Sequence, residues 1–253
     1  GVQRGNSPEL LYFDVTRGDV PVNSVDVSYE AAKGIGYIKV SKFARNTYNE
    51  FITAIAKLKQ AGCTSFVIDL RGNTGGYMDA AINMINEFMP EGRLIVYTEG
   101  KSFSRSDVYA NGTGTCKDAP IVVLTDEISA SASEIFSGAI QDNDRGTIIG
   151  RRTYGKGLVQ TQMSLSDGSE MRLTIARYYT PSGRCIQKKY EMGNTDAYDQ
   201  DIYNRYMHGE FDSADSIKMD DSLKYQTVGG RTVYGGGGIM PDIFIPRDTS
   251  GVT

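Results

Sequence analysis

The sequence has very few residues of the kinds that support imidazole or thiol chemistry: one histidine, His208, and three cysteines among 253 residues. Serine–histidine and cysteine–histidine mechanisms need an imidazole base, so any such mechanism here would have to use His208. Cys63, Cys116 and Cys185 form no C-x-x-C pair, and three cysteines cannot all pair within one chain. Chemistry that depends on clustered histidines or cysteines is therefore not indicated.

Long apolar runs and a large excess of one charge are also missing. No stretch approaches the roughly 18 apolar residues that a membrane span needs. The net charge is −4, from 27 Lys and Arg against 31 Asp and Glu, so no strong electrostatic surface for nucleic acid or anionic lipid is expected. With 40% apolar residues, the composition is that of an ordinary globular protein with a sizeable core.

Strand and helix patterns alternate through the middle of the chain. Near-continuous apolar strands at 65–70 and 120–124 are each followed by a turn and an apolar-periodic helix. Two further strand patterns, 159–165 and 171–178, flank a turn and predict a β-hairpin. We therefore predict an α/β fold of βα units with an antiparallel β extension.

The regions outside these units have a different character. Residues 1–24 hold a strand-like run at 10–16 and then a turn, and we interpret them as a trailing strand and linker. Residues 25–253 form the main domain in this interpretation. Within it, residues 187–228 are polar and weakly periodic, which predicts a surface insertion with at most one amphipathic helix.

A lysine between two glycines follows a predicted strand. Residues 150–157, G-R-R-T-Y-G-K-G, fit the G-x-x-x-x-G-K pattern of a phosphate-binding loop. Gly157 stands where that loop needs a hydroxyl for Mg²⁺, and a β pattern follows instead of a helix. Nucleotide binding is therefore not expected, and Lys156 on its own could be an ordinary surface lysine.

Serines alternate with small residues at 129–134, S-A-S-A-S-E, where a loop enters a helix. Serine at a helix start is usually a cap for free backbone N–H groups. The same place, at the carboxyl end of a parallel strand, is where α/β folds hold their sites, and free N–H groups of a first helical turn can stabilise an oxyanion. The residue types leave both the capping and the catalytic interpretation open.

A nucleophilic serine needs a base, and His208 lies in the least regular part of the chain. A neutral lysine can also accept a serine proton, although lowering a lysine pKa from about 10.4 by roughly 3 units costs about 4 kcal/mol. Lys156 has Gly155 and Gly157 as neighbours in an otherwise apolar β region, which favours desolvation of its amine. Lys156 is therefore the better candidate.

Four motifs are spaced along the chain: D-L-R-G-N-T-G-G at 69–76, S-A-S-A-S-E-I at 129–135, T-Y-G-K-G-L-V-Q at 153–160 and G-G-G-G-I-M-P-D at 235–242. In this order they resemble motifs of the carboxy-terminal processing peptidases, the tail-specific serine proteases of the S41 type. Residues 69–76 match the D-L-R-x-N-x-G-G element of that family, and 235–242 match its closing G-G-x-x-P-D element. Residues 129–135 match its S-x-S-x-S run, and 153–160 its G-K-G element. The resemblance covers roughly residues 34–185 and 229–247.

The resemblance implies roles for individual residues. The middle serine, Ser131, would be the nucleophile, Lys156 the base and Gln160 the partner that orients the lysine. Asp142 matches a carboxylate that some members need, and a structural role near a helix end fits it equally. The oxyanion hole would consist of backbone N–H groups of Ala132, Gly75 and Gly76.

The resemblance also implies the wider setting. It implies a ClpP/crotonase-like core, no metal, nucleotide or other cofactor, and protein or peptide substrates recognised by their C-terminal tails. It implies a periplasmic or cell-envelope location and allows a homo-oligomer, although no signal peptide opens this chain. Because the family usually carries a PDZ domain before this core, we expect residues 1–24 to be the trailing strand of a PDZ domain and the chain to be a fragment.

One alternative comes from a different class of function. A catalytically silent member of the same fold would bind peptides or hydrophobic ligands without cleaving them. The presence of both Ser131 and Lys156 disfavours that alternative.

Overall fold

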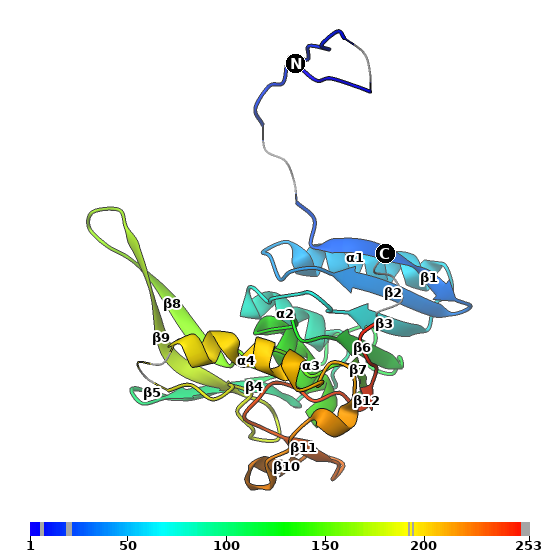
Figure 1. The fold of residues 1–253 in the computed structure, drawn as a ribbon. Coiled ribbons are helices and arrows are strands. Elements are labelled where there is room, and N and C mark those ends of the chain that lie inside the picture. Colours follow the sequence, from blue (N-terminus) through cyan, green and yellow to red (C-terminus); the bar gives the residue numbers. More distant parts are fainter. Residues whose placement is uncertain (6–7, 19–21, 192, 194, 249–253) are drawn as a thin grey trace.

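A central sheet of six strands organises the protein in a computed structural model (Figure 1). The structure describes residues 1–5, 8–18, 22–191, 193 and 195–248. In spatial order the strands are β1 (Val25–Ala32), β2 (Ile35–Val40), β3 (Ser65–Asp69), β6 (Ile121–Thr125), β7 (Thr147–Gly150) and β12 (Ile243–Phe244).

The strands β2, β3, β6, β7 and β12 are parallel, and β1 pairs antiparallel with β2. Parallel neighbours have their carboxyl ends at the same edge of a sheet. The turn 71–76 follows β3, the segment 126–131 follows β6, and the loop 151–157 follows β7. The predicted α/β core is confirmed, and its carboxyl edge gathers three of the four motifs, at 69–76, 129–135 and 153–160.

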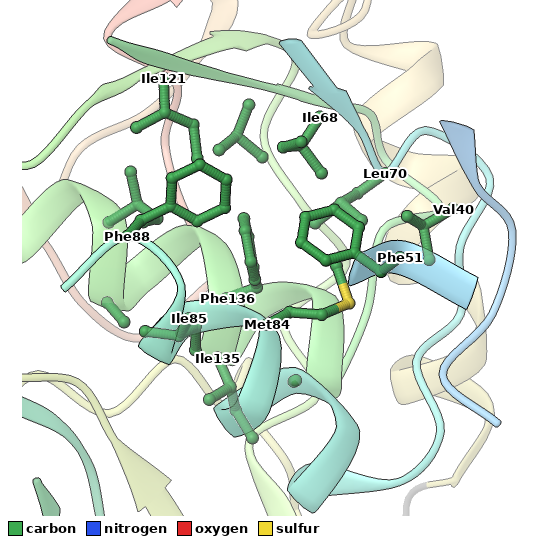
Figure 2. Packing of buried hydrophobic residues seen from close by; sticks show 14 of the residues in the cluster. Val40, Phe51, Ile68, Leu70, Met84, Ile85, Phe88, Ile121, Ile135 and Phe136 are labelled. Carbon is green, nitrogen blue, oxygen red and sulfur yellow. The ribbon is translucent and has the colours of Figure 1, made fainter. Parts of the chain in front are cut away.

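Three helices pack beside this sheet and supply much of the core. They are α1 (Thr47–Gln60), α2 (Met78–Asn86) and α3 (Ala132–Asp142). Figure 2 shows Phe51, Phe88 and Phe136 packed with Ile68 and Leu70. The Phe88 ring contacts those of Phe51 and Phe136 edge-on at 6.2 and 6.5 Å, a geometry that aromatic quadrupoles favour.

A second, antiparallel sheet has the order β5-β4-β9-β8. The predicted hairpin is confirmed as its β8 and β9, which extend away from the body as a long arm (Figure 1). The arm begins directly after the loop 151–157, so β8 continues the segment that carries Lys156. The strands are β4 (Leu94–Gly100), β5 (Phe103–Tyr109), β8 (Leu158–Ser164) and β9 (Glu170–Tyr179).

In its described residues the polar segment 187–228 contains one α-helix, α4, as predicted, but the segment is more than a surface insertion. Lys188, Arg205 and Glu210 are buried, and all three contact the loop 151–157 through hydrogen bonds. The elements here and just beyond are α4 (Thr195–Met207), η1 (Ala214–Ser216), η2 (Asp221–Leu223), β10 (Lys224–Gln226) and β11 (Thr232–Tyr234).

The strand predicted at 10–16 is not formed. Leu11 makes only an isolated bridge with Val2, and Tyr12 and Val15 are 79% and 87% exposed. An extended segment becomes a strand only when a neighbouring strand completes its hydrogen bonds, and among the described residues no strand lies beside this segment. Among the described residues, no helix is long and apolar enough to cross a membrane.

Candidate active site

Ser131 lies between β6 and α3 and caps the helix N-terminus. Its backbone has φ +56°, a conformation that non-glycine residues seldom adopt and that commonly marks functional sites. Its N–H donates to the Glu134 carboxylate at 2.8 Å. Since all eleven residues of α3 are buried, the half-exposed Ser131 is held on a rigid base and faces a cleft.

The serines on either side of Ser131 are fully buried and point into the fold. Ser129 Oγ donates to the Leu70 carbonyl at 2.8 Å, and Ser133 Oγ donates to the Asn73 carbonyl at 2.9 Å. Both hydroxyls therefore satisfy backbone groups of the turn after β3, and Ser131 alone of the three lines the cleft.

The turn 71–76 packs directly against Ser131. A Cβ on Gly75 would lie 2.8 Å from the Ser131 Cβ and 2.7 Å from the Ala130 oxygen, so only glycine fits this close approach. A Cβ on Gly76 would overlap the Phe43 carbonyl. The close contacts of the turn with Ser131, Ala130 and Phe43 therefore explain why positions 75 and 76 are glycines.

Asn73 organises this turn, and the sequence analysis gave it no role. Its side-chain nitrogen donates to the Val40 carbonyl at 2.9 Å, and its Oδ1 accepts the Gly75 N–H at 2.8 Å. Its own carbonyl accepts the Ala130 N–H at 3.0 Å. The sequence signal for this role is an asparagine within a glycine-rich turn. The structure shows that this asparagine is buried.

The three N–H groups expected to form the oxyanion hole differ in whether they already donate a hydrogen bond. The Gly75 N–H is already occupied by Asn73 Oδ1. Within the described part of the chain, the N–H groups of Ala132 and Gly76 donate to no protein acceptor. These two groups are therefore the ones available to an oxygen beside Ser131.

Asp69, at the end of β3, anchors the beginning of the same turn. Its buried carboxylate accepts hydrogen bonds from the guanidinium and the backbone N–H of Arg71 and from the hydroxyl of Tyr37, with the shortest Arg71 contact at 2.7 Å. Burial raises the pKa of Asp69, but the hydrogen bonds from Arg71 and Tyr37 outweigh burial and hold it below its ordinary value.

Lys156 is half-buried in the irregular loop 151–157. The Gly155 and Lys156 N–H groups donate to Glu134 at 2.7 and 2.8 Å. The Gly157 N–H donates to Gln187 Oε1 at 2.9 Å. The loop lies outside any helix or strand, and these side chains fix it together with backbone bonds such as the one from the Tyr154 N–H to the Ser129 carbonyl at 2.9 Å.

One cleft of about 400 Å³ brings most of the predicted residues together. Ser131, Lys156, Gln160 and Gly76 all contribute to its wall. The remaining wall is formed by Phe43, Thr74, Tyr77, Leu158, Gln162, Arg172 and Tyr178.

Asp142 is not part of this cleft. It lies at the far end of α3, eleven residues from Ser131, or roughly 16 Å along a helix that rises 1.5 Å per residue. Its carboxylate pairs with Arg184 at 2.7 Å, both side chains fully buried, and accepts the Ser182 hydroxyl at 2.7 Å. The structure thus gives Asp142 an ion pair that holds α3 to the segment after β9.

His208 is exposed directly after α4, and its Nδ1 lies 2.6 Å from the Asn204 carbonyl. It does not line the cleft. Among the described residues, no group of three or more His, Cys, Asp and Glu side chains could hold a metal ion.

The fold and the cleft define a class: α/β proteins that hold a serine at a helix start, beside free N–H donors and a lysine, at the carboxyl edge of a parallel sheet. Residues 34–196 match the model of peptidase family S41. The chain belongs to peptidase family S41.

Similar proteins agree with this assignment. The chain is 38% identical over 179 residues to a carboxyl-terminal-processing protease of Synechocystis sp., covering 70% of this chain and 42% of that protein. It is 38% identical over 159 residues to a chloroplastic C-terminal processing peptidase of Tetradesmus obliquus, covering 62% of this chain and 34% of that protein. The chain therefore spans less than half the length of these relatives.

A solved structure shows the same fold. The photosystem II D1 C-terminal processing protease superposes with a TM-score of 0.63 at 28% identity. The superposition covers 91% of this chain and 50% of that one. The likeness extends across the central sheet and beyond the residues matched by the family model.

Proposed function

We propose that this chain is the catalytic core of a serine-type endopeptidase that cleaves protein substrates recognised by their C-terminal tails. The observation that carries the proposal is a single cleft lined by Ser131, Lys156, Gln160 and Gly76, in which the Gly76 N–H donates to no acceptor in the described part of the chain. The names of the relatives support the substrate class. A periplasmic or other envelope-side location is part of the same proposal.

In the first half-reaction, Ser131 Oγ attacks the scissile carbonyl carbon while its proton passes to the neutral Lys156 Nζ. The carbonyl oxygen becomes an oxyanion and accepts hydrogen bonds from the Ala132 and Gly76 N–H groups. When the tetrahedral intermediate collapses, the C–N bond breaks and Lys156 returns its proton to the leaving amine. The product is an acyl ester on Ser131.

In the second half-reaction, a water molecule attacks the ester carbonyl and gives a proton to Lys156. Collapse breaks the ester bond, releases the new carboxyl end and returns the proton to Ser131 Oγ. Gln160, four residues after Lys156 on β8, lines the cleft where its amide can orient the lysine amine.

The deciding experiment combines peptide hydrolysis with a fluorophosphonate label, which reacts only with a nucleophilic serine. Ser131→Ala should lower kcat at least about 1,000-fold and abolish labelling. Ser129→Ala and Ser133→Ala are matched controls, because each removes a hydroxyl bonded to backbone, and each should keep substantial activity while losing about 1 kcal/mol of stability. An unlabelled wild-type chain that still binds peptides would instead indicate a silent binding module.

A further inference from the structure

Glu134 lies between the segment that carries Ser131 and the loop that carries Lys156, and it is completely buried. Its Oε2 accepts the Ser131 N–H and the Lys156 N–H, each at 2.8 Å. One oxygen atom therefore bridges the backbones of the two residues to which the proposed function assigns the chemistry.

The other carboxylate oxygen strengthens the same bridge. Glu134 Oε1 accepts the Gly155 N–H at 2.7 Å and the Thr153 hydroxyl at 2.5 Å. The Thr153 oxygen in turn accepts the Ile239 N–H at 2.6 Å, so its single proton is directed to Glu134. The bridge thus reaches the closing segment of the chain as well.

All four groups that contact Glu134 are donors, which suits an acceptor-only carboxylate. Burial raises the pKa of Glu134, while the hydrogen bonds from Thr153, Lys156, Ser131 and Gly155 oppose that shift. In Glu134→Gln, one of the two carboxylate oxygens becomes an NH2 group, which is a donor and would face two other donors.

A glutamate at the third position of a helix often caps the helix by reaching back to the N-cap N–H. Capping explains only the contact with Ser131. The contacts with Thr153, Gly155 and Lys156 cross 19, 21 and 22 residues of sequence and serve a loop that has no regular secondary structure. Three of the four hydrogen bonds therefore do something other than cap α3.

We propose that Glu134 is a positioning residue that fixes Lys156 relative to Ser131 through these backbone bonds. This inference rests on the proposed function. Reacting groups must be held to within a fraction of an ångström, and a displacement of about 1 Å can cost on the order of 100-fold in rate. Glu134 does not contact the substrate in this assignment, so its effect passes entirely through the two residues that it joins.

The variant that tests the proposal is Glu134→Gln in the full 253-residue chain. We expect native circular dichroism, a 30- to 100-fold lower kcat and a KM within about threefold of wild type. The rate of fluorophosphonate labelling should fall in parallel, since the base no longer activates Ser131. Glu134→Asp should not rescue activity, because its shorter side chain cannot reach both segments.

Glu87→Gln is the matched control. Glu87 is also a buried carboxylate; it accepts the Tyr48 hydroxyl at 2.7 Å and the Thr115 N–H at 3.0 Å, and it does not line the cleft. We expect Glu87→Gln to keep kcat within about threefold. Equal losses in both variants, or wild-type kcat and labelling in a folded Glu134→Gln, would overturn the positioning role.

A measurement on the wild-type chain needs no variant and no activity. The amides of Ser131, Gly155 and Lys156 share one carboxylate, so they should open together and show hydrogen-exchange protection factors within about threefold of one another. Fast exchange at Gly155 and Lys156 beside a protected Ser131 would overturn the inference. An inactive chain in which the three amides exchange together would refute the proposed function alone.

Discussion

The two halves of the proposed dyad are held in opposite ways. Ser131 opens a helix whose eleven residues are all buried, and its neighbours Ser129 and Ser133 are bonded to backbone of the adjoining turn. Lys156 lies in a loop outside any helix or strand, which Glu134, the segment around α4 and the bond from the Tyr154 N–H to the Ser129 carbonyl hold in place. The nucleophile is placed by the core, and the base by a loop that side chains and backbone groups from other parts of the chain hold.

This difference predicts where each half can be damaged. Changes to the core should alter stability and activity together, because α3 is part of the cooperative fold. Changes to the side chains that fix the loop 151–157 should reduce activity more than stability. Four changes, taken from the largest expected effect to the smallest, test that comparison.

The first change removes the base without removing its charge. Lys156→Arg should lower kcat more than about 100-fold, as Lys156→Ala should, because arginine does not give up its proton near neutral pH. Peptide hydrolysis with circular dichroism as the folding check measures it. Turnover within about tenfold of wild type would mean that the cation only binds substrate, since tenfold is about 1.4 kcal/mol of barrier.

The second change loosens the base loop from outside. Arg205 of α4 donates to the carbonyls of Thr153 and Arg152 at 3.0 and 2.8 Å, and Glu210 holds its guanidinium. Arg205→Ala should lower kcat by roughly tenfold, because the loop loses two fixed carbonyls. Arg205→Lys keeps the positive charge but not the forked guanidinium, so its kcat should lie between those of wild type and Arg205→Ala.

The Arg205 variants are compared with Ser133→Ala, which removes a hydrogen bond beside Ser131 and leaves the loop 151–157 unchanged. Thermal unfolding and kcat are measured for each. If Arg205→Ala lowered the melting temperature strongly and left kcat of the folded protein unchanged, the α4 segment would serve only the fold.

The third change tests how the stability that Asp69 gives to the turn beside Ser131 depends on pH. The folded-state pKa of Asp69 lies below its unfolded value of about 3.9, so its stabilisation is complete above that value and is lost as pH falls through the folded pKa. Asp69→Asn should therefore cost about 1–3 kcal/mol in urea unfolding at pH 7, and the gap to wild type should narrow below about pH 4. A gap that stayed constant down to pH 2 would contradict this assignment.

The smallest effect is expected at His208. It is exposed, lies outside the cleft and has no part in the proposed chemistry. His208→Ala should keep kcat within about twofold. A folded His208→Ala protein without turnover would indicate that the base is the His208 imidazole and not Lys156.

Local sequence patterns carried much of the fold. The near-continuous apolar strands identified β3 and β6, because central strands of the sheet bury their side chains. Two strand-like runs around a polar turn identified β8 and β9, although most of that hairpin is exposed. The same reasoning failed at 10–16, where the strand-like composition is present but no neighbouring strand supplies hydrogen bonds. A strand depends on its partners as well as on its own residues.

The candidate site divides in the same way. Ser131, Lys156 and Gln160 stand in motifs that the sequence displays, and the structure places them in one cleft. The sequence could not show that the Gly75 N–H is occupied, or that Asp142 is paired with Arg184 far from Ser131. Those facts depend on which groups meet, and sequence spacing does not determine that.

What the sequence determined by itself is therefore the βα units and the hairpin, the peptidase family and the residues with suitable chemistry. Only the tertiary structure decided that Glu134 joins the serine and lysine segments, and that the polar stretch around Arg205 fixes the lysine loop. The physical reason is that periodicity records the burial of a segment's own side chains. A buried carboxylate or guanidinium is defined instead by distant donors and acceptors that folding brings to it.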